Sequence, residues 1–141
     1  MPQPVKLEIA EGELAINSKT TIILMDNSLK STAQIFADDM AVFFDSKPLK
    51  VSNSHRKATN KSIFLSLKSS LAAEAYELYV NTNGVLIEGG SAAGVFYGLQ
   101  SLRQMIIQTD GKVPYCEVVD EPTFGYRGVH LDVSRHFFTM D

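Results

Sequence analysis

The sequence contains no tryptophan and a single cysteine, Cys116, among its 141 residues. One cysteine excludes an internal disulfide bond and a zinc cluster built from cysteines. We interpret Cys116 as a small apolar residue of a strand. Because tryptophan is absent and Tyr76, Tyr79 and Tyr97 form no obvious stacking platform, the sequence disfavours a lectin-like protein.

Basic residues are also scarce, since 13 Lys and Arg stand against 16 Asp and Glu for a formal net charge of −3. No run of basic residues occurs, so we expect neither a nucleic acid nor an anionic membrane surface as a partner. No apolar run approaches the ~20 residues that span a bilayer. Residues 1–14 hold no hydrophobic core of a signal peptide.

Metal and cofactor motifs are missing as well. The three histidines are His55, His130 and His136, and no His-Glu-x-x-His motif is present. Residues 88–90, Glu-Gly-Gly, precede a helix start but lack the remaining residues of a phosphate-binding loop. We therefore expect no metal site and no cofactor.

Two amphipathic helices are predicted by their apolar periodicity. The first runs over 29–44, with Asn27 or Ser28 as its cap, and the second follows a cap at Ser91. In the second helix Gly94 and Gly98 lie four residues apart, which predicts close approach to a sheet. The two apolar stripes consist of Leu29, Ala33, Phe36, Met40 and Phe43, and of Val95, Leu99, Leu102 and Ile106.

Strand patterns surround these helices. They cover 14–17, 19–25 and 62–68, and a hairpin over 74–90 turns at Asn83-Gly84. The polar stretch 51–62 is predicted to be a surface loop. The order of elements predicts an α+β domain over residues 1–110, with two helices on one face of a mainly antiparallel sheet.

A connector is predicted over 111–125, in which 115–120 is a short strand or extended linker. The segment 126–141 then alternates apolar and polar residues and carries an arginine near its end. This pattern is typical of a strand of an α/β barrel, whose functional side chains project from the carboxyl ends of strands. Such a barrel needs about 250 residues, so we expect 126–141 to be the first strand of a truncated barrel.

Three motifs together carry a resemblance to a known family. The chain is similar to glycoside hydrolase family 20, the β-N-acetylhexosaminidases, most strongly from residue 91 onward. The matching residues are Gly94, Phe96, Tyr97, Gly98, Gln100 and Leu102; Asp120, Pro122 and Phe124; and Arg127, Gly128, Leu131, Asp132, Arg135 and His136. Residues 74–78, Glu-Ala-Tyr-Glu-Leu, resemble a further motif of the family, with Ala75 in place of glycine.

The resemblance implies a zincin-like accessory domain joined to a catalytic (β/α)8 barrel. It implies that Arg135 binds hydroxyls of a terminal N-acetylhexosamine in the parent enzyme, since a guanidinium offers a planar fork of donors. Asp132 and His136 are candidates to orient Arg135 and the neighbouring strands, although Asp132 is equally interpreted as a structural residue.

The family's adjacent Asp-Glu pair, which orients the substrate acetamide and supplies the general acid, has no counterpart here. The adjacent acidic pairs at 38–39 and 120–121 are interpreted as solvated and structural respectively. No catalytic residue is therefore assigned within the chain, and we expect it to be inactive alone.

The expected function is that of the N-terminal domain of a β-N-acetylhexosaminidase acting on N-acetylhexosamine-terminated glycans, with the missing barrel of the same chain as its partner. By resemblance the parent is secreted or periplasmic. Two alternatives remain open: a free-standing interaction or carbohydrate-binding module, and the N-terminal domain of an O-GlcNAc hydrolase or α-glucuronidase. Self-association through 126–138 is also expected, because an unpaired apolar strand templates association.

Overall fold

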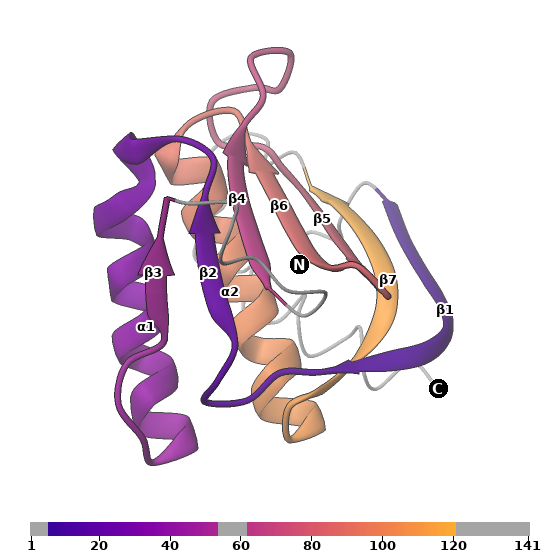
Figure 1. Cartoon of the computed structure of the whole chain (residues 1–141). Helices are drawn as coiled ribbons and strands as arrows, with labels where there is room; N and C mark the ends of the chain where they lie inside the picture. Colours follow the sequence, from indigo (N-terminus) through magenta and orange to yellow (C-terminus); the bar gives the residue numbers. More distant parts are fainter. Residues whose placement is uncertain (1–5, 54–61, 121–141) are drawn as a thin grey trace.

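The computed structural model describes residues 6–53 and 62–120, which form one seven-stranded sheet with two long helices on one side (Figure 1). Across the sheet the strands run in the order β1-β7-β5-β6-β4-β2-β3. The helices are α1 (Lys30–Phe44) and α2 (Ala92–Thr109), with a 3-10 turn at Asn27–Leu29 before α1. The strands are β1 (Lys6–Ala15), β2 (Thr21–Leu24), β3 (Lys50–Ser52), β4 (Ile63–Leu67), β5 (Tyr76–Asn81), β6 (Gly84–Gly89) and β7 (Lys112–Asp120).

The sheet is mixed, so the prediction of a mainly antiparallel sheet is wrong. Strands β3, β2, β4 and β6 are joined by parallel ladders. Strands β6, β5, β7 and β1 are joined by antiparallel ladders. Within residues 6–53 and 62–120, β5 and β6 are the only consecutive strands that pair as a hairpin. The helical crossover from β2 through α1 to β3 returns the chain in its original direction, which produces a parallel pair.

The first helix has the predicted extent, and its apolar stripe faces the sheet. Leu29, Ala33, Phe36 and Met40 are buried in the core, while Phe43 packs at its border. The predicted cap is wrong by one or two residues: the Asp26 carboxylate accepts hydrogen bonds from Ser28 N at 2.9 Å and Ser28 Oγ at 2.7 Å. The cap lies earlier because the 3-10 turn precedes the α-helical residues.

The second helix begins at the predicted Ser91 cap, whose hydroxyl accepts a hydrogen bond from Ala93 N at 3.2 Å. Its predicted apolar stripe is buried throughout. The predicted close approach is also confirmed. A Cβ at Gly98 would lie 2.6 Å from Ile87 Cγ2, and a Cβ at Gly94 would collide with the carbonyl oxygen of Ala75.

The strands agree with the predicted hairpin but differ elsewhere. Asn81 pairs with Gly84, so β5 and β6 form a tight hairpin in which Gly84 has φ +116°. Residues 51 and 52, predicted as loop, belong to the edge strand β3, which pairs in parallel with β2. A strand of three residues shows too little alternation to be recognised from sequence.

Residues 111–125 were expected to leave the domain, yet Lys112–Asp120 form β7 inside the sheet. Of the two interpretations given for 115–120, the strand is therefore the correct one. β7 lies between β1 and β5, because the α2 crossover lays the chain down beside β5. The predicted barrel strand at 126–141 lies outside the described residues.

Gly98→Ala is predicted to destabilise the fold. In an open helix this change would stabilise by about 1 kcal/mol. Here the added methyl meets Ile87 Cγ2 and lies 3.2 Å from the Tyr76 ring. We expect a loss of about 1–3 kcal/mol in the free energy of unfolding, the usual cost of overpacking.

Urea denaturation followed by circular dichroism measures this change. Gln108→Ala, at an exposed position of the same helix, is the control and should change stability by less than about 0.5 kcal/mol. A Gly98→Ala variant as stable as the parent would contradict the close contact.

Candidate site at the carboxyl end of β7

A buried polar network lies where β7 ends. Tyr76, the first residue of β5, is opposite Asp120, the last residue of β7, in the antiparallel ladder. The Tyr76 hydroxyl is 2.5 Å from Ser101 Oγ on α2. Tyr76 is 2% exposed, Asp120 7% and Ser101 9%. These side chains from three elements therefore share one site closed off from water.

The electrostatics of the site favour an uncharged phenol. Burial raises the pKa of Tyr76 well above its ordinary value, and the Asp120 carboxylate adds to that shift through its charge and a hydrogen bond. The hydrogen bond with Ser101 acts in the opposite direction. Tyr76 is therefore a protonated hydrogen-bond donor at physiological pH.

Two glycines of α2 make room for this network. Without a side chain at Gly98 the Tyr76 ring fits beneath the helix, and Gly94 lets the helix lie against the backbone leading into β5. The helix motif, the Glu-Ala-Tyr-Glu-Leu motif and Asp120 of the Asp-x-Pro-x-Phe motif thus converge at one end of the sheet. Sequence spacing gave no sign of this convergence, because the three motifs are far apart along the chain.

The site residues predicted for the parent enzyme cannot be placed. Arg135, Asp132 and His136 all lie outside the described residues, so their roles stay predictions. The two carboxylates of the acidic pair on α1 have different partners. Asp38 accepts a hydrogen bond from Gln34 at 3.1 Å, whereas Asp39 lies 3.7 Å from Arg103 Nε on α2.

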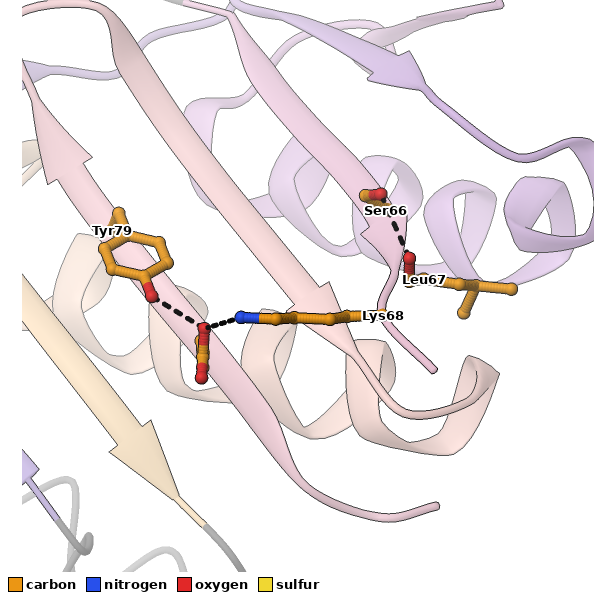
Figure 2. Close-up of polar contacts among 5 residues, drawn as sticks. Ser66, Leu67, Lys68 and Tyr79 are labelled. Atoms are coloured by element: carbon orange, nitrogen blue, oxygen red, sulfur yellow. Dashed lines mark hydrogen bonds and ion pairs between the residues drawn. The ribbon is translucent and has the colours of Figure 1, made fainter. Parts of the chain in front are cut away.

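A second polar group, which sequence reasoning missed, lies on the helix-free face of the sheet. Lys68 Nζ and the Tyr79 hydroxyl both donate to Glu77 Oε1, at 3.1 and 2.6 Å (Figure 2). The contact with Glu77 raises the pKa of Lys68. Burial and then the Glu77 carboxylate raise the pKa of Tyr79. This group ties the end of β4 to β5, and its contacts suit a structural role.

A shallow hollow of about 360 Å³ adjoins this face, between β1, β5 and β7. Its lining includes Tyr79, Tyr115, Glu8, Glu117 and Asn81. β1, at the edge of the sheet, changes register against β7 between Ile9 and Glu13. Of the three tyrosines considered from sequence, Tyr76 is buried and only Tyr79 borders this hollow.

Within residues 6–53 and 62–120 no cluster of His, Cys, Asp and Glu has the arrangement to hold a metal ion. In the same part of the chain, neither helix has the length and apolar character needed to cross a membrane.

Comparison with known families identifies the family of this chain. Residues 1–121 match the family described as "Glycosyl hydrolase family 20, domain 2". The chain belongs to glycosyl hydrolase family 20. The family 20 match sets aside the O-GlcNAc hydrolase and α-glucuronidase alternatives, and its extent to residue 121 agrees with the inclusion of β7 in the domain.

Curated relatives of this family 20 domain include β-hexosaminidases. A β-hexosaminidase of Porphyromonas gingivalis is 33% identical over 152 residues, and a β-N-acetylhexosaminidase of Cellulomonas fimi is 34% identical over 147. Both matches cover 100% of this chain but only 19% and 29% of the respective relative. The chain therefore spans less than a third of either relative.

Solved structures show the same fold. The N-acetyl-β-hexosaminidase of Streptomyces plicatus, in complex with Thio-NAglucal, superposes with a TM-score of 0.73 at 24% identity, covering 88% of this chain and 26% of that chain. The family 20 exo-β-N-acetylglucosaminidase of Vibrio harveyi, in complex with N-acetylglucosamine, gives 0.71 at 20% identity, covering 90% and 19%. The two helices on a mixed sheet are thus a fold found in family 20 enzymes.

Tyr76→Phe is predicted to change both stability and its dependence on alkaline pH. Loss of the hydroxyl removes one hydrogen-bond partner from the buried side chains of Ser101 and Asp120. We expect this loss to lower the free energy of unfolding by about 1–3 kcal/mol near pH 7. Because the folded pKa is raised, the stabilising contribution is complete below the unfolded pKa near 10. It is lost as pH rises above that value, since only the unfolded chain then releases the proton.

The measurement is urea denaturation at pH 7, 9, 10 and 11. The parent should lose stability above pH 10 more steeply than Tyr76→Phe, by up to about 1.4 kcal/mol per pH unit. Burial also raises the pKa of Cys116 to about 12, and this effect is common to both proteins. Equal slopes in the two proteins would contradict a buried Tyr76 phenol.

Proposed function

We propose that the chain is the non-catalytic N-terminal domain of a β-N-acetylhexosaminidase that removes terminal non-reducing N-acetylhexosamine residues from glycans by substrate-assisted retaining catalysis. The observation that carries the proposal is the match of residues 1–121 to domain 2 of family 20. The 33% and 34% identical relatives, both named as β-hexosaminidases, support it.

The architecture proposed for the parent follows from the same resemblance. The domain is zincin-like in topology and extends to the end of β7 at Asp120. Residues from about 126 begin a (β/α)8 barrel, in which Arg135 binds sugar hydroxyls while Asp132 and His136 support it. In this proposal the family's Asp-Glu pair lies in the barrel, and the domain's partner is that barrel.

The outer face of the two helices is the surface that we propose to meet the barrel. Ile35 and Val42 on α1 are 51% and 84% exposed, and Ile107 on α2 is 38% exposed. Asp39 and Arg103 form an ion pair from one helix to the other, at 3.7 Å. Exposed apolar side chains rimmed by polar groups are typical of interaction surfaces.

The alternative is a carbohydrate-binding module of the same fold. A feature that favours it is the hollow beside Tyr79 and Tyr115, which combines aromatic rings with carboxylate and amide groups. It would require a chain that works without a barrel.

Hydrolysis of p-nitrophenyl N-acetyl-β-D-glucosaminide distinguishes these functions. The 141-residue chain should release no nitrophenol above background, because it lacks the acid and the acetamide-orienting carboxylate. A reading frame that continues beyond Asp141 with a barrel-sized segment and an adjacent Asp-Glu pair is expected, and its product should be active.

Two results would contradict the proposal. One is activity of the 141-residue chain itself. The other is a natural stop codon after Asp141 together with chitobiose-dependent chemical shift changes around Tyr79 and Tyr115, which would favour the binding module.

A further inference from the structure

Asp120 is an unusual residue with which to end a strand. It is 7% exposed, although it carries a carboxylate and stands at the end of β7. A buried carboxylate is costly unless hydrogen bonds replace its water. The surroundings of Asp120 therefore indicate that the position of this side chain is fixed by specific partners.

The direction of the hydrogen bonds can be deduced from their chemistry. Tyr76 lies opposite Asp120 in the ladder, and hydrogen bonding with Asp120 raises the pKa of Tyr76, as expected where the phenol donates its single proton to a carboxylate. Tyr76 then has no proton left for Ser101, so at the 2.5 Å contact Ser101 Oγ donates to Tyr76. The order Ser101 to Tyr76 to Asp120 thus joins α2, β5 and the end of β7.

Each member of this chain of hydrogen bonds is itself held in place. Tyr76 pairs with Gly89 of β6 on one side and with Asp120 of β7 on the other. A Cβ at Gly98 would lie 3.2 Å from the Tyr76 ring, so the ring lies close beneath α2. The Asp120 carboxylate is consequently fixed relative to both the sheet and the helix layer.

We propose that Asp120 is a positioning residue for the hexosaminidase reaction. Through Tyr76 and Ser101 it fixes the point and direction from which the chain leaves β7 toward the segment that carries Arg135. This inference rests on the proposed function. It adds to that function a specific role for three residues of the accessory domain, none of which touches substrate.

The local part of the proposal is tested in the 141-residue chain by amide hydrogen exchange. Tyr76→Phe should speed exchange at Val119 and Asp120 by about tenfold or more, while the Val113 end of β7 stays protected. The matched control is Val80→Ala, a buried position on the same strand that pairs with Cys116 instead of Asp120. In this control the amides at the Asp120 end of β7 should exchange no faster than those in the rest of the strand.

The functional part is tested in the enzyme encoded by the full reading frame. Asp120→Ala should lower kcat/KM for the nitrophenyl substrate by about tenfold to a hundredfold, since displacement of a substrate-contacting group by about 1 Å costs that much. Asp120→Asn keeps an acceptor for the Tyr76 hydroxyl and should restore most of the loss. Val80→Ala should leave kcat/KM near the parent value when assayed well below its melting temperature.

The outcomes separate the two proposals. An inactive full-length parent overturns the proposed function, and hydrogen exchange still decides whether the network holds the end of β7. An active parent with unchanged kinetics in Asp120→Ala overturns the positioning role alone. Equal kinetic losses in Asp120→Ala, Asp120→Asn and Val80→Ala would reduce the role to stability and also overturn it.

Discussion

The close contact of α2 with the paired strands β5 and β6 is the constraint on which the rest of the structure depends. Gly94 and Gly98 allow the helix to approach until its own backbone meets the sheet. Only at that separation does Ser101 reach the Tyr76 hydroxyl, and only then are both excluded from water. Packing thus comes first, and the buried polar network is a consequence of it.

Because the helix contact comes first, it explains why the side chains buried at the end of β7 are polar. A tyrosine and a serine could be replaced by apolar residues of similar size with little loss of stability, since buried hydrogen bonds contribute only about 1 kcal/mol net. A buried carboxylate at Asp120 adds desolvation cost and needs these partners. Directional hydrogen bonds fix orientation in a way that apolar packing does not.

The sequence predicted those parts of the fold that local patterns control. Both helices, the Ser91 cap and the β5–β6 hairpin follow from periodicity and turn residues within a few positions. The directions of the strands did not follow, because a parallel pair such as β2–β3 depends on how a crossover helix packs. For the same reason the place of β7 inside the sheet did not follow from the sequence: its neighbours, β1 and β5, are distant in sequence. Family membership follows from motifs, whereas the meeting of Tyr76, Ser101 and Asp120 depends on the three-dimensional fold.

The most direct test of the account is proton NMR of the Tyr76 hydroxyl in the 141-residue chain. A buried donor between Ser101 and Asp120 should give a separate, slowly exchanging hydroxyl resonance with nuclear Overhauser contacts to Ser101 Hβ and to protons of Asp120. The account predicts that this resonance is present near pH 7 and lost in Tyr76→Phe. A Tyr76 hydroxyl that exchanges freely with water in the folded protein would contradict it.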